Sequence, residues 1–496
     1  MKKNLLVVVI LLSISFSGWA QTKFDFNAAC IQAYQDITKL KTKTGQQQIQ
    51  KLQLQQPDNL IPVLLENYID FYTLFLNEDP SDYTRLFPQF QERLDRVEAG
   101  NSNSPFYLYA QAVIRMQRAM VQVKFGNFWD AGWECRKAFL LLKENKKKFP
   151  QFSLNDLWFG ALEAVIGTVP KGYKWITSLF GMKGSLTEGM RKVRNYANSN
   201  DATAKQFFNE SVFVYTYLLF YFENKKEDAL EYIIHKKLDL VNNHLHAFMA
   251  ANLALNNKDA ERTKSIILHL NKSPEYLKLS VWNFQLGYAH LYHLETTEAI
   301  HYFNEYTSQF KGKFYLKDVY QKMSWAYYLQ GNIKEANTHK QLAITKGSTF
   351  SDADKKALKD AKAKNWPNPI LLKARLFNDG GYHSDALKQF AGKSSNDFNK
   401  EEEKLEFAYR LARIYDDLGK KEEAIKNYLI AIRLGQNRRE YFAARAALQI
   451  GQIYEERGEK ALAIEYYKKC IDMEDHEYKD SLDQRAKSGI ARCTGN

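Results

Sequence analysis

Little in this chain of 496 residues is typical of β-structure. Runs that alternate apolar and polar residues, clusters of valine and threonine, and Asn-Gly turns are scarce, and there are only 10 prolines. The hydrophobic content of 45% and the aromatic content of 14% are nevertheless too high for a disordered chain. We therefore expect an all-α fold with a large core.

The chain also has few cysteines and no CxxC pair, which excludes the common zinc and redox motifs. The 4 cysteines are Cys30, Cys135, Cys470 and Cys493. Cys470 and Cys493 end two helices that we expect to pack side by side. A disulfide between them and a pair of free buried thiols are both compatible with the sequence, because an exported protein meets an oxidising compartment.

Motifs of catalysis and cofactor binding are missing as well. There is no HExxH and no GxSxG, and the GKSS at residues 392–395 is no phosphate loop, because Leu387 stands where the earlier glycine is needed. His290 and His293 lie on one predicted helix, near His301, without a third ligand at metal spacing. We expect hydrogen-bonded or exposed histidines there, no metal, no cofactor and no enzyme activity.

The first residues, MKKNLLVVVILLSISFSGWAQ, have the layout of a signal peptide over residues 1–20. Lys2 and Lys3 form the basic start, an apolar run over residues 5–14 is too short to span a bilayer comfortably, and small residues precede Gln21. An uncleaved membrane anchor is the alternative. We expect an exported protein in the periplasm, with association to the outer membrane as one location there.

The net charge indicates the kind of partner. It is +13 for the whole chain and +11 without Lys2 and Lys3, the only charged residues in the first 20. A basic exported protein meets anionic lipid, glycan or peptide. Nucleic acid is not expected as a partner, because of the export signal.

One pattern of small residues, a Gly or Asn turn and aromatic residues recurs in six stretches. The two cleanest copies have these anchors: Ala412, Tyr415, Gly419, Ala424, Tyr428 and Ala431, then Gly451, Tyr454, Gly458, Ala463, Tyr467 and Cys470. Successive marker alanines, which are Ala299, Ala336, Ala386, Ala424 and Ala463, step by 37, 50, 38 and 39 residues. Each copy predicts two antiparallel helices, and pairs of this kind must stack to bury their apolar faces.

The pattern resembles the tetratricopeptide repeat (TPR) family, with matches at Ala408, Leu411, Ala412, Tyr415, Ala424, Tyr428 and Ala431. The resemblance implies a right-handed α-solenoid in which the first helix of each pair lines a concave groove that binds a protein or peptide. It implies an aromatic-lined groove with these partner-binding residues: Phe284, Tyr288, Tyr292, Trp325, Tyr328, Tyr409 and Arg413. The alternative is that these side chains pack against the next helix. The Lys and Asn that clamp carboxylates in the family are absent from these positions.

We divide the chain by how well it follows the repeat. After the signal peptide come N-terminal helices (21–100), divergent helix pairs (101–275), TPR pairs (276–350), a polar joint (351–369) and C-terminal TPR pairs with a capping helix (370–496). The sequence gives no oligomeric state. The expected function is a non-catalytic envelope scaffold for protein–protein interaction.

Residues 154–196 break the repeat with six glycines and Pro170, which predicts a tightly packed helical hairpin. Residues 105–345 resemble the inclusion-body-clearance and lipid-droplet group of TPR proteins, and also exported TPR proteins of Gram-negative bacteria. The residues that carry the first likeness are Phe159, Gly160, Gly167, Pro170, Gly181, Gly184 and Gly189. Aromatic and basic residues in the segment 154–182 suit a membrane interface, so lipid or glycan binding with peripheral membrane contact is the alternative function. The residues proposed for that interface are Trp158, Lys171, Lys174, Trp175 and Phe180.

Overall fold

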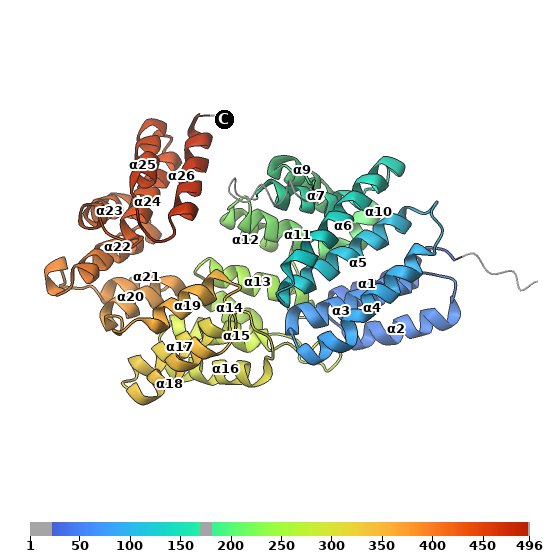
Figure 1. The fold of residues 1–496 in the computed structure, drawn as a ribbon, viewed down its shortest axis with the longest axis horizontal. Coiled ribbons are helices and arrows are strands. Elements are labelled where there is room, and N and C mark those ends of the chain that lie inside the picture. The colour runs from blue at the N-terminus through green and yellow to red at the C-terminus, as the bar shows by residue number, and fades with distance from the viewer. Residues whose placement is uncertain (1–21, 169–180, 495–496) are drawn as a thin grey trace, which may run out of the picture.

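A computed structural model describes residues 22–168 and 181–494 of the chain. Those residues form α-helices, one 3₁₀-helix and no strand, apart from one isolated bridge between Lys23 and Asn59. Figure 1 shows antiparallel helix pairs stacked one after another along the molecule. The predicted all-α solenoid is therefore confirmed. The predicted signal peptide lies outside the described residues.

The N-terminal block, which we define as α1–α12, encloses one continuous apolar core. Its helices are α1 (Ala28–Thr38), α2 (Thr42–Gln55), α3 (Ile61–Asn77), α4 (Pro80–Glu98), α5 (Pro105–Lys124), α6 (Phe128–Lys148), α7 (Asn155–Gly167), α9 (Leu186–Ala197), α10 (Ala202–Gln206), α11 (Phe208–Tyr221) and α12 (Lys226–His235). At its centre, the Tyr34 and Tyr68 hydroxyls donate hydrogen bonds of 2.9 and 3.3 Å to the Glu210 carboxylate. Burial raises the pKa of Glu210 to about 7, although these hydrogen bonds oppose the shift.

Helices α7 and α9 form a hairpin in which the two backbones touch. A Cβ atom on Gly189 would lie 2.4 Å from both the Ala164 nitrogen and the Gly160 oxygen. A Cβ atom on Gly184 would lie 2.4 Å from the Glu163 oxygen. Gly184 and Gly189 are therefore needed for close approach, since a side chain at either position would push the backbones apart.

The middle block, α13–α19, continues the stack. Its helices are α13 (His244–Asn256), α14 (Ala260–Leu268), α15 (Val281–Tyr292), α16 (Thr296–Gln309), α17 (Leu316–Leu329), α18 (Ile333–Thr345) and α19 (Asp352–Lys362). Helix α19 lies inside the polar segment 351–369 that we expected to act as a joint, and it packs against α17 and α18. Glu275 ties this block to the N-terminal block, because its carboxylate accepts a 2.9 Å hydrogen bond from Thr44 and pairs with Lys41 at 3.1 Å.

The C-terminal block, α20–α26, holds the most regular pairs. Its helices are α20 (Pro369–Gly380), α21 (His383–Lys388), η2 (Ser395–Asp397), α22 (Glu401–Asp417), α23 (Lys421–Gly435), α24 (Phe442–Glu456), α25 (Lys460–Asp472) and α26 (Lys479–Thr494). A Cβ atom on Gly451 would lie 2.6 Å from the Tyr467 ring, which explains why the repeat pairs a small residue with an aromatic one. Cys470 and Cys493 are both free thiols in this structure.

Candidate functional site

The aromatic residues predicted to bind a partner in the middle block lie on α15 and α17. Tyr288 and Trp325 are only 6% and 3% exposed. Tyr288 packs on Phe303 of α16 with ring centres 5.3 Å apart, and α20 packs against α15. Leu372 and Leu376 of α20 belong to the same apolar cluster, and Phe284, Tyr292 and Tyr328 are partly buried against it. The packing alternative thus describes Tyr288 and Trp325 in this structure.

Two further contacts join residues 366–376 to the aromatic side chains of α17. The Arg375 guanidinium of α20 lies 5.0 Å from the centre of the Trp325 ring. Trp366, just before α20, stacks on Tyr328 with ring centres 4.6 Å apart. The chain therefore fills its own middle groove with residues 366–376, and this arrangement could not be read from the repeat spacing.

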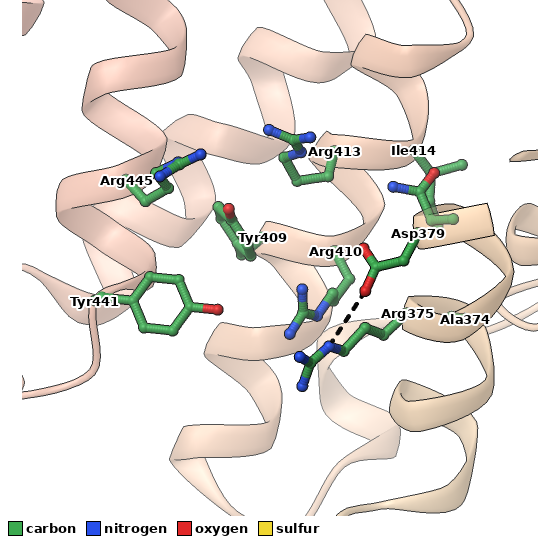
Figure 2. Close-up of a pocket in the computed structure, with 10 residues that line it drawn as sticks. Ala374, Arg375, Asp379, Tyr409, Arg410, Arg413, Ile414, Tyr441 and Arg445 are labelled. Carbon is green, nitrogen blue, oxygen red and sulfur yellow. Dashed lines mark ion pairs between the residues drawn. The ribbon is translucent and has the colours of Figure 1, made fainter. Parts of the chain in front are cut away.

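The other two predicted partner-binding residues, Tyr409 and Arg413, line a pocket of about 220 Å³ in the C-terminal block. Figure 2 shows this arginine pocket, with side chains from α20 and α22 and from the start of α24 pointing toward one another. Its lining residues are Ala374, Arg375, Asn378, Asp379, Tyr409, Arg410, Arg413, Ile414, Tyr441 and Arg445. Four arginines thus face one aspartate within a single concavity.

Helical periodicity explains how the arginines reach the pocket. On α22, Ala408 and Ala412 are buried toward the second helix of the pair, with 1% and 0% of their surfaces exposed. Arg410 and Arg413 are three residues apart, so they lie on a common face one turn from each other. Arg375 and Asn378 occupy equivalent spacing on α20. Three neighbouring helices therefore present polar side chains to one concave surface.

Most of these arginines already have a carboxylate beside them. Arg375 pairs with Asp379 at 3.5 Å, Arg410 with Glu406 at 2.9 Å and Arg413 with Asp417 at 3.8 Å. Each of these carboxylates lies four residues from its arginine on the same helix, which holds the guanidinium in place. Arg410 also packs beside aromatic rings, 5.7 Å from Tyr409 and 5.5 Å from Phe442, so its head group is positioned before any ligand arrives.

Asp417 pairs with more than one cation. It accepts a 2.8 Å hydrogen bond from Asn378 and pairs with Lys258, which reaches it from the turn between α13 and α14. Although burial opposes the shift, Lys258 and Arg413 hold the pKa of Asp417 below its usual value. Burial and the neighbouring Arg413 lower the pKa of Lys258 in spite of this pairing.

Arg445 differs from its neighbours because it has no ion pair among the described residues. Its Nε atom is buried without a hydrogen-bond partner in the part of the chain that the structure covers. A buried donor that lacks a partner costs free energy until a ligand satisfies it. With guanidiniums held in place and one of them unsatisfied, the pocket is suited to an anion with planar, paired oxygens, such as a carboxylate.

Sequence reasoning missed Arg375, Arg410 and Arg445. Arg410 directly follows Tyr409, which the sequence predicts to bind a partner. The position of Arg410 in the same helix was the signal that could have identified it. Arg375 belongs to a weak copy of the repeat, and Arg445 lies one helical turn before Leu448, where the repeat register predicts that the groove positions of its copy begin. No sequence signal showed that three copies would direct arginines to one point.

The remaining predicted features lie elsewhere. His290 and His293 both bond to the Glu295 carboxylate, at 2.5 and 2.7 Å, and residues 22–168 and 181–494 contain no cluster of three metal-ligating side chains. Trp158 of the predicted membrane interface is partly buried and packs on the N-terminal core. The other members, Lys171, Lys174, Trp175 and Phe180, fall outside the described residues. Within the described ranges, no helix has the length and apolarity that crossing a membrane requires.

Comparison with known proteins agrees with the repeat assignment. A sequence model described as Tetratricopeptide repeat matches residues 405–436 and 444–476, which are the helix pairs α22–α23 and α24–α25. No curated protein matches the chain. The resemblance of residues 105–345 to the inclusion-body-clearance group finds no support in these matches and stays a hypothesis.

Solved structures of low identity also align with the chain. The human IFIT1 dimer with m7Gppp-AAAA is 11% identical, with 96% of this chain and 91% of that chain covered and a TM-score of 0.36. The APC/C hetero-tetramer Cut9-Hcn1 is 15% identical, with 92% and 95% covered and a TM-score of 0.28. The P58(IPK) TPR domain is 13% identical, with 87% and 97% covered and a TM-score of 0.22. Scores this low say nothing about ligands. The chain therefore contains tetratricopeptide repeats, which are matched over the helix pairs α22–α23 and α24–α25.

Proposed function

We propose that this protein is an exported, non-catalytic scaffold of the cell envelope that holds an acidic segment of a partner protein in its C-terminal groove. The observation that carries the proposal is the arginine pocket, where four arginines and one aspartate line one concavity. TPR proteins typically bind protein or peptide partners, so a peptide is the natural source of the anion. The predicted signal peptide supports the envelope location, and the net charge of +11 without Lys2 and Lys3 supports an acidic partner.

The energetics favour a carboxylate-bearing side chain. Hydrogen bonds between charged groups contribute about 1.5–3 kcal/mol each. Arg375 and Arg410 keep their bonded carboxylates four residues away, so a ligand need not order these side chains first. Arginine and tyrosine also carry much of the binding energy at protein interfaces, and Tyr409 and Tyr441 lie beside the guanidiniums.

Fluorescence anisotropy with a labelled dodecaglutamate peptide tests the proposal. Wild-type protein should bind this peptide and ignore a Gly-Ser peptide of equal length. Arg410→Gln should weaken binding about tenfold or more, because one charge-assisted contact is lost. Arg438→Gln is the matched control, since Arg438 pairs with Glu440 at 2.7 Å and does not line the pocket. Equal binding of both peptides, or equal loss in both variants, would refute a specific acidic site.

The location has its own test. Cells that express the full chain should release it with the periplasmic fraction, and a version lacking residues 1–20 should stay in the cytoplasm. Retention of the full chain in the cytoplasm would contradict export but leave the peptide-binding proposal standing.

A further inference from the structure

A second cavity, which we call the glutamine pocket, lies in the N-terminal block. Its volume is about 300 Å³, enough for a small ligand. Helix α3 packs against both α2 and α4, and the three helices lie at the N-terminal end of the stack (Figure 1). All three line the pocket, with Gln46, Ile49 and Gln50 of α2, Glu66, Ile69 and Asp70 of α3, and Arg85, Leu86, Gln89 and Arg93 of α4.

The deepest part of the glutamine pocket is an arginine shared by two carboxylates. The Nη2 atom of Arg93 lies 2.7 Å from Asp70 Oδ2, and its Nε atom lies 3.4 Å from Glu66 Oε2. Arg93 and Asp70 are only 6% and 8% exposed. Charges buried to this extent are costly unless further hydrogen bonds satisfy them.

These buried groups are not fully satisfied. The contact between Arg93 and Asp70 is short but is not directed as a hydrogen bond, so Asp70 Oδ2 has no hydrogen-bond donor within residues 22–168 and 181–494. The hydrogen bonds that Arg93 does donate are long, at 3.4 Å to Glu66 and 3.5 Å to the Asn67 oxygen. Burial raises the pKa of Asp70 although Arg93 opposes the shift. Asp70 therefore needs a donor, and Arg93 needs a closer acceptor.

A hydroxyl group meets both needs, because it donates one hydrogen bond and accepts others. It can accept from the Arg93 guanidinium while it donates to the Asp70 carboxylate. An ammonium would be repelled by Arg93, and a carboxylate would be repelled by Asp70 and Glu66. The lining has as many carboxylates as guanidiniums, unlike the arginine pocket, so it suits a neutral ligand.

The walls favour a ligand with several hydroxyl groups. Gln46 and Gln50 lie one turn apart on α2, and Gln89 lines the pocket from α4. Each side-chain amide offers two donors and one acceptor oxygen, which matches the mixed donor and acceptor character of hydroxyls. Apolar surface for the C–H groups of such a ligand comes from Ile49, Ile69 and Leu86.

We propose that the glutamine pocket binds a neutral sugar, either free or as one unit of a glycan. One hydroxyl of the sugar bridges Arg93 and Asp70, and the amides of the walls hold its other hydroxyls. The inference goes beyond the proposed function and does not depend on it, because the two pockets share no residue.

The first measurement identifies the ligand. Saturation-transfer NMR on the full chain uses glucose, galactose, mannose, N-acetylglucosamine and maltotriose as neutral probes, and at least one should bind at millimolar concentration. Putrescine, a cationic probe, should not displace the bound sugar. If none of these sugars binds, or if putrescine displaces the sugar at equal concentration, the inference is wrong. Tighter binding of maltotriose than of glucose supports a glycan unit as the source, and the reverse order supports a free sugar.

The second measurement places the ligand, with the tightest of these sugars as the probe. Gln46→Ala and Gln50→Ala should each weaken binding about threefold or more, the loss of one neutral hydrogen bond. Gln47→Ala is the matched control and should bind as wild type does, because Gln47 is exposed on the same helix and does not line the pocket. If both pocket variants bind as the control does, the sugar binds elsewhere and the inference is wrong.

Two further variants sharpen the assignment. Asp70→Asn should weaken binding about tenfold or more, because a charged acceptor is lost. If this buried substitution unfolds the protein, which circular dichroism would show, the two glutamine variants still decide. Arg410→Gln should leave sugar binding unchanged. A loss of sugar binding in Arg410→Gln would place the sugar in the arginine pocket and overturn the inference, whereas a failure of dodecaglutamate to bind overturns only the proposed function.

Discussion

The N-terminal and C-terminal blocks solve the same packing problem in different ways. In the C-terminal block, each pair uses a small residue opposite an aromatic ring, as at Gly451 and Tyr467. In the N-terminal block, α7 and α9 touch through backbone at Gly160 and Gly189, and one carboxylate, Glu210, sits at the centre of the core. The pairing of a small residue with an aromatic ring recurs along the sequence, whereas the backbone contact belongs to the single hairpin α7–α9. Regular pairs leave a polar concave face available for a ligand, whereas the N-terminal contacts serve stability.

The largest expected effect is at the backbone contact of the N-terminal block. Gly189→Ala places a Cβ atom 2.4 Å from backbone atoms of Ala164 and Gly160, and backbone cannot rotate away as a side chain can. We expect a loss in the free energy of unfolding of more than about 3 kcal/mol, at the upper end of overpacking effects. Urea unfolding followed by circular dichroism measures it.

Gly181→Ala is the matched control inside the same glycine-rich stretch, because nothing lies within 4 Å of a Cβ atom there. It should cost only the strain of a left-handed residue, about 1 kcal/mol. If both variants lose the same stability, close helix approach is not what these glycines provide.

The next effect is a pH dependence that belongs to the N-terminal block. The pKa of Glu210 is raised from 4.5 to about 7 when folded, so the folded protein holds this proton more tightly than the unfolded chain does. The stabilisation is fully present below about pH 4.5 and is lost as pH rises through about 7. A shift of this size corresponds to about 3 kcal/mol at most, and we expect somewhat less.

Unfolding of wild type and of Glu210→Gln at a series of pH values checks the sign. The variant resembles the protonated carboxyl, so its stability relative to wild type should improve from acid to mildly alkaline pH. A constant difference between the two proteins would show that Glu210 does not titrate in this range. Arg410→Gln should leave the pH profile unchanged, because it lies in the C-terminal block and far from Glu210 in the fold.

Much of the fold could be predicted from the sequence, because the repeat anchors are local. Ala412, Gly419, Ala424 and Tyr428 each have a role within one helix pair, and the two pairs that the TPR model matches are those with the most complete anchors. The same register predicts Tyr409 and Arg413 for the groove, and both residues line the arginine pocket. The glycine-rich hairpin could be expected as an exception, since the six glycines in 154–196 serve no repeat position.

What could not be predicted depends on contacts between distant segments. Helix α20 returns to cover Trp325, and no period in the sequence specifies which earlier helix it meets. Lys226 contacts Asn256 at the end of α13, and Lys258 pairs with Asp417 of α22; spacing in the sequence specifies neither contact. The same holds for ion pairs. The cations can be counted in the sequence, but only the fold shows which of them lack a neighbouring carboxylate.

The smallest expected effect tests whether the divergent pairs keep the turn of the regular ones. Gly419 ends α22 with φ of +75°, and Asn224, between α11 and α12, has φ of +58° in the same left-handed region. Gly419→Ala meets no atom within 4 Å, so backbone strain alone should cost about 1 kcal/mol. Asn224→Gly should have the opposite sign and raise stability by about 0.5 kcal/mol, because Asn224 is exposed and glycine adopts this conformation freely. The urea midpoints of the two variants are the measurement. A loss of stability in both variants would mean that the Asn224 side chain contributes more than its backbone angle does. The left-handed turn would then account for less of the stability of the N-terminal block than of the C-terminal block.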